Sequence, residues 1–431
     1  MPEIPAAAVE LMKFLAESAT SAHAVEAAAG MLDRLGFDRR SERERWDGAP
    51  SKPFYVTRGL GSLVAVVPGA SPPWESGFRI VGAHTDYPGF RLKPSPVRMK
   101  GSSAMLGVEV YGSPIIATWF DRDLTLAGTA WFGKPGEAPE PRLWRLEGPV
   151  CRISMPAMHL NRGVNDEGFT FNKEENLCPM LVLSGVTADS LARAIADACS
   201  ERPDRLAGFA GHVVDCQPAA VGGLAGEMIF SGRIDNLAMT HAAVRSLAGL
   251  RNPATTAVAC VFDNEEVGSS TFSGAASNFL DAVLERICSP AGREGLFRAI
   301  PRSVMVSADA AHAFNPCYEG RFDRENRPLL NGGPVIKVNS MQRYSTSAPT
   351  SAYFAECARA AGVQVQSYVS RNDMPCGSTI GPIISSRLGI AAVDAGNPTL
   401  SMHSVREAAG VEDHGMMISV LMKHMEGCIP V

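Results

Sequence analysis

Hydrophobic and polar positions recur along the chain with two different periods. Near the N-terminus the apolar residues follow helical spacing, at Val9, Leu11, Met12 and Leu15. A second helical pattern runs from about residue 23 to residue 35 and ends before Gly36. Short runs of β-branched residues at 62–67 and 78–81 follow, bounded by proline and glycine, and they predict buried strands.

From Ser231 onward, strand-like runs alternate with helical segments. The strands are expected at residues 256–262, 303–306, 335–338 and 389–393. This alternation predicts the α/β class, with a mixed, largely parallel sheet sandwiched between helices. We expect that sheet to form a catalytic domain.

The pattern changes between about Arg91 and Gly223. Strand-like pieces alternate there with proline-rich turns, and one clear helix is expected near residues 188–199. We therefore predict a discontinuous catalytic domain, residues 1–90 and 224–431, interrupted by a β-rich inserted domain at 91–223. A chain of 431 residues is long enough for two such units.

Composition and charge exclude several classes of function. The chain is 45% hydrophobic and 20% charged, which is typical of a folded globular protein. Its net charge is −5 and its lysines and arginines are scattered, so nucleic acid is a poor candidate partner. We find no secretory signal and no apolar run of about 18 residues, which disfavours secretion and membrane spanning. Ten dispersed cysteines without a C-x-x-C pair predict reduced thiols and a cytoplasmic location.

Acidic residues and histidines gather at four places, at or just after expected strand ends. These residues are His84 and Asp86, Asp235, Glu265 and Glu266, and Asp309, with His403 near the C-terminus. In open α/β sheets the loops at the carboxyl ends of strands line the binding crevice, so these groups can converge. Imidazole and carboxylate ligands suit zinc and also cobalt or manganese, and they predict a catalytic metal site.

In two of these motifs, neighbouring residues are expected to have different roles in the site. His84 and Asp86 lie two residues apart, so on an extended chain both side chains point the same way and Asp86 can hold the second ring nitrogen of a ligating His84. In the Glu265–Glu266 pair, one carboxylate can bind metal while the other takes a proton from water. Taken alone, the first motif is more often a structural pair and the second a solvated turn.

Six separated segments carry a resemblance to a known family. They are Ala83–Gly89, Trp119–Leu124, Arg233–Leu237, Asp263–Ser269, Ser307–His312 and Met402–Glu407. In order and in content they resemble the aspartyl aminopeptidases, family 18 of the metallo-aminopeptidases. Six matches along most of one chain are far more specific than any single motif.

The resemblance implies a two-zinc hydrolase that removes the N-terminal residue from peptides. By the resemblance, Asp235 bridges two zinc ions, and the remaining ligands are His84 and Asp309 at one ion and Glu266 and His403 at the other. Glu265 is then the general base. The resemblance also implies a cis peptide bond between Asp235 and Asn236. Cobalt or manganese remain possible substitutes for zinc.

Further roles rest on the same resemblance. His159 in the insert is expected to reach the active site of a neighbouring subunit, in a homo-oligomer that is typically a dodecamer built from dimers made by the insert. An N-terminal aspartate or glutamate needs a cation in the first pocket, and Lys337 and Arg343 are the candidates. Tyr87 and the segment 373–379 have no assigned role.

Two other functions remain open from the residues. The first is hydrolysis of another small amide by a related two-metal enzyme, because the metals activate water whatever the leaving amine. The second is a catalytically inactive oligomeric scaffold. The presence of every expected ligand and of Glu265 argues against the scaffold.

Overall fold

The structure is a computed structural model that describes residues 3–46, 48, 50–182 and 185–430. The prediction that the N-terminal segment is not a secretory signal includes Met1 and Pro2, which lie outside these residues. The contacts divide the chain into two compact units: Met1–Asp86 with Ala219–Met402 and Glu407–Val431, and Tyr87–Pro218 with His403–Arg406. The expected role of the insert in dimerisation stays a prediction.

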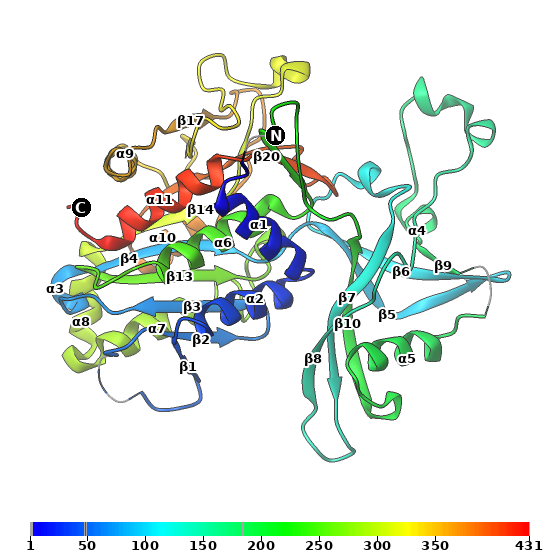
Figure 1. Cartoon of the computed structure of the whole chain (residues 1–431), viewed down its shortest axis with the longest axis horizontal. Coiled ribbons are helices and arrows are strands. Elements are labelled where there is room, and N and C mark those ends of the chain that lie inside the picture. The colour runs from blue at the N-terminus through cyan, green and yellow to red at the C-terminus, as the bar shows by residue number, and fades with distance from the viewer. Residues whose placement is uncertain (1–2, 47, 49, 183–184, 431) are drawn as a thin grey trace. The chain divides into compact units, whose positions relative to one another are not determined.

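The first unit is built on a nine-stranded sheet (Figure 1). In spatial order its strands are β1 (Asp38–Arg40), β2 (Phe54–Arg58), β3 (Ser62–Val67), β13 (Thr256–Phe262), β4 (Phe78–His84), β14 (Val304–Ala308), β18 (Ala391–Gly396), β16 (Val335–Val338) and β17 (Gln366–Val369). β13, β4, β14 and β18 are parallel to one another, whereas β3 and β16 run antiparallel to their neighbours β13 and β18. The predicted mixed, largely parallel sheet is therefore confirmed.

Helices cover both faces of this sheet, as Figure 1 shows. One hydrophobic cluster joins the sheet to α1 (Ala6–Glu17), α2 (Ser21–Asp33), α6 (Ile234–Ala248), α9 (Ala348–Ala360) and α11 (Asp413–Glu426). A second cluster contains residues of α7 (Phe279–Cys288), α8 (Gly292–Ala299) and α10 (Ile380–Leu388). Along β13, Ala257, Ala259 and Val261 face the first cluster, and Val258 and Cys260 face the second. A strand buried on both faces needs this continuous apolar run.

The N-terminal helices begin slightly earlier than their apolar residues indicate. α1 begins at Ala6, and α2 begins at Ser21 because the Thr20 side chain accepts the backbone N–H of His23 and caps the helix. Polar caps lie outside the hydrophobic pattern, so the pattern alone placed the second helix about two residues too late.

A smaller sheet in the first unit joins distant parts of the chain. Its strands are β11 (Ala220–Gly222), β12 (Met228–Ser231), β20 (Glu407–Gly410), β19 (Pro398–Leu400) and β15 (Ala311–His312). β12 pairs antiparallel with β20, and Ser231 lies opposite Glu407. This pairing places Glu407 close to the start of α6.

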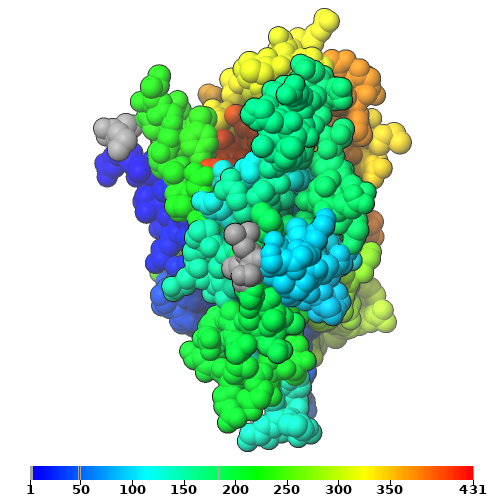
Figure 2. Space-filling model, turned by 90° about the vertical axis from the view of Figure 1, so that its right-hand side faces the viewer, coloured from blue at the N-terminus to red at the C-terminus, as the bar shows by residue number. Residues whose placement is uncertain are grey.

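The second unit is an antiparallel sheet packed against one helix. Its strands, in spatial order, are β8 (Glu140–Arg145), β7 (Leu124–Phe132), β10 (Leu206–Asp215), β5 (Gly89–Lys100), β6 (Ser103–Tyr111) and β9 (Met180–Val182). The helix α5 (Ala188–Ala198) buries Leu191 and Ile195 in the core of this unit. Figure 2 shows the surface that carries the β5–β6 turn (light blue) and the β7–β8 turn (cyan, bottom). The β-rich character predicted for the insert is thus present.

Membrane spanning can be tested on the helices themselves. Among the residues that the structure describes, none of the helices is both long enough and apolar enough to cross a bilayer.

Candidate metal centre and active site

Three neighbouring parallel strands deliver the predicted site residues to one edge of the sheet. β4 lies between β13 and β14. β4 ends at His84, β14 is followed at once by Asp309, and β13 leads through two residues into a short 3-10 helix, η5 (Glu265–Val267). Because the three strands run in the same direction, their carboxyl ends meet at the same edge.

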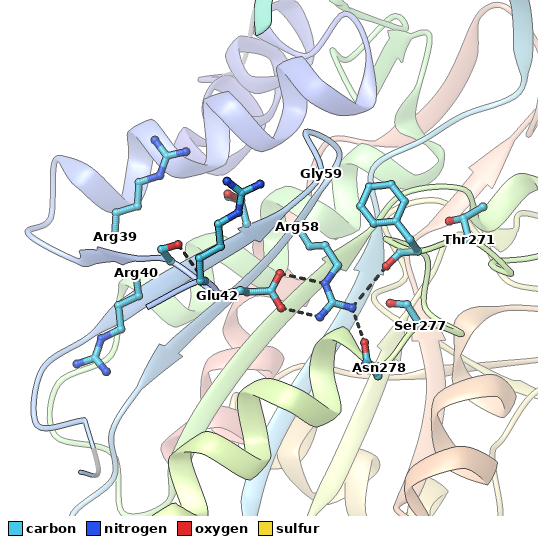
Figure 3. Close-up of a pocket in the computed structure, with 12 residues that line it drawn as sticks. Arg39, Arg40, Glu42, Arg58, Gly59, Thr271, Ser277 and Asn278 are labelled. Carbon is cyan, nitrogen blue, oxygen red and sulfur yellow. Dashed lines mark hydrogen bonds and ion pairs between the residues drawn. The ribbon is translucent and has the colours of Figure 1, made fainter. Parts of the chain in front are cut away.

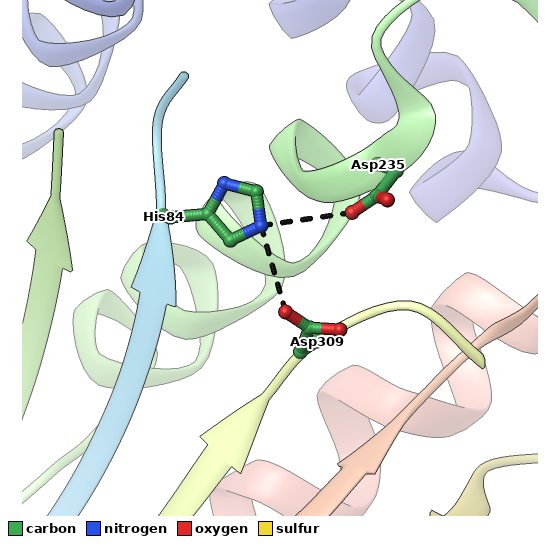
Figure 4. Close-up of side chains that lie close together, drawn as sticks. All are labelled: His84, Asp235 and Asp309. Carbon is green, nitrogen blue, oxygen red and sulfur yellow. Dashed lines mark ion pairs between the residues drawn. The ribbon is translucent and has the colours of Figure 1, made fainter. Parts of the chain in front are cut away.

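His84, Asp235 and Asp309 form the centre of the site (Figure 4). The Nε2 atom of His84 lies 3.7 Å from Oδ1 of Asp235 and 3.5 Å from Oδ2 of Asp309. All three side chains are buried. One imidazole nitrogen and two carboxylates within 4.8 Å of one another are a donor set that suits zinc. One ammonium group, that of Lys337, contacts Asp309 and leaves the two buried carboxylates with excess negative charge, so the site fits a metal cation on chemical grounds as well.

Asp235 lies in the first turn of α6 and not at the end of a strand of the nine-stranded sheet. The side-chain N–H of Asn236 donates to the carbonyl of Ala308 at 2.9 Å, and the hydroxyl of Thr240 donates to the carbonyl of His84 at 2.6 Å. These two bonds tie α6 to the ends of β14 and β4. The peptide bond between Asp235 and Asn236 is cis, as the resemblance implied.

Glu407 is a contact that sequence reasoning missed. Its Oε2 atom accepts the backbone N–H of Asp235 at 3.0 Å, and its side chain is buried. Glu407 is the last residue of the segment 402–407, one of the six that resemble the family. That motif does not indicate that Glu407 contacts Asp235. The contact arises because β20 pairs with β12, directly before α6.

Asp86 contacts two different parts of the site. The Nδ1 atom of His84 lies 3.0 Å from the backbone carbonyl oxygen of Asp86 and 3.4 Å from its Oδ1. When the imidazole is neutral, donation from Nδ1–H to that carbonyl leaves the lone pair of His84 on Nε2, the atom that faces Asp235 and Asp309. The carboxylate of Asp86 also accepts the backbone N–H groups of Glu265 at 3.0 Å and Glu266 at 3.1 Å.

Glu265 has the electrostatic properties of a proton acceptor. Its Oε2 atom lies 3.9 Å from Nε2 of His84. Burial raises the pKa of Glu265 to about 7, with His84 opposing the shift and the carboxylates of Asp309, Asp86 and Asp235 adding to it. A carboxyl group with a pKa near neutrality suits general acid–base catalysis.

The ligand pair His84 and Asp309 shows opposite shifts. Burial alone lowers the pKa of His84, but hydrogen bonds to Asp309 and Asp86 and the charge of Glu265 hold it well above its ordinary value. Burial alone raises the pKa of Asp309. The charge of Lys337, together with the hydrogen bond and charge of His84, holds the pKa of Asp309 well below its ordinary value. Asp309 is therefore ionised, as a metal ligand must be.

The two predicted substrate cations lie in different environments. Lys337 is buried on β16, and its Nζ atom donates to Oδ1 of Asp309 at 2.5 Å and to the carbonyl of Ala310 at 3.1 Å. Arg343 is exposed, and its backbone N–H lies 3.5 Å from Oδ1 of Asn339. Lys337 thus contacts a predicted metal ligand. The backbone hydrogen bond of Arg343 goes to Asn339, which is not a predicted ligand.

Two predicted site residues belong to the second unit. His159 lies on an exposed 3-10 helix, η2 (Met158–Leu160). The Nδ1 atom of His403 lies 3.0 Å from the carbonyl oxygen of Ser113, so Nδ1 carries the proton and Nε2 keeps the lone pair needed for a metal ligand. Their catalytic and ligand roles stay predictions.

A separate cavity in the first unit has a volume of about 740 Å³ and is lined by Arg39, Arg40, Glu42, Arg58 and their neighbours (Figure 3). Figure 3 shows the guanidinium groups of Arg39 and Arg40 pointing in different directions. Arg58 already donates to both oxygens of Glu42 and to the side-chain oxygen of Asn278. None of the predicted metal ligands lines this cavity, so the chemistry described above does not take place there.

Comparison with known proteins identifies a family of zinc metalloproteases. The profile of the family described as "Aminopeptidase I zinc metalloprotease (M18)" matches residues 14–424. A relative in Pseudomonas aeruginosa, strain LESB58, named as a probable M18 family aminopeptidase 2, is 43% identical over 421 residues. The match covers 95% of this chain and 96% of the relative.

Solved structures show the same fold. A chain from the cryo-EM structure of the Ape4 and Nbr1 complex is 35% identical with a TM-score of 0.94, and the match covers 97% of this chain and 85% of that one. A chain of the S. cerevisiae mApe1 dodecamer is 26% identical with a TM-score of 0.83, and covers 96% of this chain and 95% of that one. With the family profile and the full-length relative in agreement, this chain belongs to the M18 family of zinc metallo-aminopeptidases.

Proposed function

We propose that this M18 aminopeptidase uses two zinc ions and the general base Glu265 to release an N-terminal aspartate or glutamate from peptides. The observation that carries the proposal is the buried group of His84, Asp235 and Asp309 with Glu265 at its edge. This arrangement places metal-binding donors and a carboxyl group with a pKa of about 7 side by side.

Five side chains would hold the zinc ions. His84 and Asp309 belong to one ion, Glu266 and His403 to the other, and Asp235 to both. The donor geometry of His84 and the protonated Nδ1 of His403 support this assignment. When bound, zinc acts as a Lewis acid that polarises a carbonyl and lowers the pKa of water.

Glu265 moves the protons of the reaction. Its carboxylate takes a proton from the water that attacks the scissile carbonyl and then returns it to the departing amine. Asp86 holds Glu265 in place through the backbone N–H bond and orients His84 through the carbonyl contact. The contribution of Asp86 is therefore one of positioning.

Lys337 is the proposed partner of the acidic side chain at the substrate's first residue, with Arg343 as a second cation. A buried ammonium group near the ligand Asp309 can discriminate between an acidic and a neutral side chain because only the acidic one can accept a charge-assisted hydrogen bond from it. Lys337 already contacts Asp309, so substrate would share this cation with a metal ligand.

We also propose assembly into a homo-oligomer. The mApe1 relative has been solved as a dodecamer, and a dodecamer built from dimers is the proposed state of this chain. The exposure of His159 agrees with a role at a neighbouring subunit's active site, where it would donate a hydrogen bond to the oxyanion.

The test uses peptides that begin with Asp, Glu, Leu or Lys and metal-free enzyme with added zinc, cobalt or manganese. We expect metal-dependent release of the first residue, fastest from the Asp and Glu peptides. Glu265→Gln should lower kcat by about 10²–10⁴-fold while zinc binding is retained. Undiminished cleavage by Glu265→Gln would refute the general-base role.

Other outcomes separate the remaining possibilities. Efficient cleavage of only neutral peptides would refute the acidic preference and the role of Lys337. Hydrolysis of N-acyl amino acids without peptide cleavage would identify a different amidohydrolase, and inactivity with every metal would indicate a scaffold.

A further inference from the structure

Asp394 is a fully buried carboxylate with no part in the chemistry proposed above. Its Oδ2 atom accepts the backbone N–H and the hydroxyl of Ser345, each at 2.6 Å, and its Oδ1 atom accepts the hydroxyl of Thr379 at 2.5 Å. Its backbone N–H donates to the hydroxyl of Thr346 at 2.9 Å. A single residue of β18 thus binds two separate loops.

The sheet register places Asp394 in a row with Lys337 and Asp309. β16 and β18 pair antiparallel, with Ile336 opposite Ala395, so the next pair outward is Lys337 and Asp394. Residues directly opposite in a sheet share a face. On the other side, Ser307 of β14 lies opposite Asp394, and Asp309 follows Ser307 by two residues. Lys337 completes the row through its 2.5 Å contact with Asp309.

The two loops held by Asp394 are packed tightly around it. One is residues 339–347, between β16 and α9, and the other is residues 376–379, which lead into α10. Thr379 also accepts the backbone N–H of Gly381 and caps α10. A Cβ atom at Gly381 would lie 2.5 Å from Oδ2 of Asp394 and 2.8 Å from the Ser345 hydroxyl. The close packing leaves no space for a side chain there.

Lys337 lies against the first of these loops. Its Nζ atom lies 5.0 Å from the centre of the Tyr344 ring, and Tyr344 is buried beside Cys376 of the second loop. The ammonium group is therefore bounded by Asp309, by Tyr344 and by the strand that carries Asp394.

We propose that Asp394 is a positioning residue for the pocket that receives the substrate's first side chain. It fixes both loops by hydrogen bonds and holds the Lys337 ammonium in place by its charge. The inference rests on the function proposed above, and it assigns part of the segment 373–379 to the wall of that pocket.

The test compares Asp394→Asn with two variants that keep the charge of Asp394. Ser345→Ala removes one hydrogen bond to Asp394, and Thr379→Val removes another together with the cap of α10. The asparagine keeps the size of the side chain but turns an N–H2 group toward hydroxyl or N–H donors. We expect KM for Asp-initiated peptides to rise about tenfold, the effect of losing about one charge-assisted hydrogen bond. The kcat for Leu-initiated peptides and the zinc affinity should stay within about threefold.

Hydrogen exchange supplies a readout that does not depend on substrate preference. Asp394→Asn should speed amide exchange in residues 339–347 and 376–381 together. Ser345→Ala should loosen only the first loop, and Thr379→Val only the second. These milder variants also cover the case in which Asp394→Asn does not fold.

The outcomes distinguish this inference from the function on which it rests. Unchanged exchange in both loops, or an equal loss on every peptide accompanied by loss of zinc, would overturn the role of Asp394. A wild-type enzyme that does not prefer acidic peptides would refute the proposed specificity, while the exchange data would still decide whether Asp394 organises the pocket wall.

Discussion

The carboxylate of Asp86 accepts the backbone N–H of Glu265 at 3.0 Å. Its second oxygen accepts the N–H of Glu266 at 3.1 Å, and its backbone carbonyl lies 3.0 Å from Nδ1 of His84. One residue therefore fixes the ligand at the end of β4 and the acidic turn that follows β13. Hydrogen bonds to an ionised carboxylate are roughly twice as strong as neutral ones, so this link is substantial.

We expect Asp86→Ala to weaken zinc binding by about 10–100-fold, because its carboxylate accepts the backbone N–H of the proposed ligand Glu266 and lies 3.4 Å from Nδ1 of the ligand His84. The kcat at saturating zinc should also fall, since the turn that carries Glu265 loses both of its bonds to the carboxylate. Chelator competition measures the affinity, and peptide hydrolysis measures the rate.

Asp86→Asn is the matched control because it keeps the shape and one oxygen acceptor. Its amide N–H2 faces one of the two backbone donors, so its losses should lie between those of the wild type and of Asp86→Ala. Wild-type zinc affinity in Asp86→Ala would contradict the role of the Asp86 carboxylate in holding the metal ligands.

Removal of zinc should lower the unfolding temperature. A ligand that binds only the folded state stabilises it by about 2.7 kcal/mol at a free concentration of 100 times Kd. Zinc also offsets repulsion among the buried carboxylates of Asp235, Asp309 and Glu265. Calorimetry with zinc and with a chelator measures the shift. The same experiment on Asp309→Asn should give a smaller shift, and identical transitions of the wild type under both conditions would contradict the metal site.

Much of the site follows from local pattern. His84, Asp309 and Glu265 could be predicted to converge because each follows an apolar strand, and the carboxyl ends of parallel strands meet at one edge. The spacing predicts that the carboxylate of Asp86 holds the second ring nitrogen of His84. That carboxylate lies 3.4 Å from Nδ1, and the shorter contact, at 3.0 Å, comes from the backbone carbonyl of Asp86. These predictions needed only the direction of the strands.

The remaining contacts depend on which strands are neighbours. Glu407 reaches the backbone of Asp235 across 172 positions in the chain, through the pairing of β20 with β12. The sequence makes Lys337 a candidate cation for the substrate, but it does not show that Lys337 is buried against Asp309, which depends on β16 lying beside β18. Hydrophobic alternation shows which face of a strand is buried and does not identify the neighbouring strand.

Replacement of His159 tests whether subunits share an active site. His159→Ala should lower kcat by about 10²–10³-fold, the effect of losing one oxyanion donor. Co-expression with Glu265→Gln should restore activity, because random pairing gives an intact site at about one quarter of positions when His159 acts on the partner subunit. His84→Gln mixed with Glu265→Gln is the control. His84 and Glu265 lie in the same unit of one chain. Every active site in this mixture therefore lacks one of the two residues, and the mixture should stay inactive. No restoration in the first mixture would exclude action in trans.

Buried histidines should make the zinc-loaded protein sensitive to acid. His424 lies between Tyr353 and Ile80, where Nε2–H donates to the carbonyl of Ile80 and Nδ1 contacts the Tyr353 hydroxyl, both at 3.0 Å. Burial, together with the charge of Arg79, lowers the pKa of His424 to about 3. Burial also lowers the pKa of His241 to about 4.

The direction of the pH effect follows from proton uptake. In the unfolded chain a histidine has a pKa of about 6.5, so between pH 6.5 and about 3 the unfolded state binds a proton at His424 that the folded state excludes. Stability from this group is therefore present above pH 6.5 and is lost as pH falls, by about 2 kcal/mol between pH 7 and pH 5. Urea unfolding followed by tryptophan fluorescence measures the loss. His424→Gln should be less stable than the wild type at pH 7. Its free energy of unfolding should change less with pH than that of the wild type, by up to about 1.4 kcal/mol per pH unit. An unchanged slope would mean that His424 takes up its proton in the folded state.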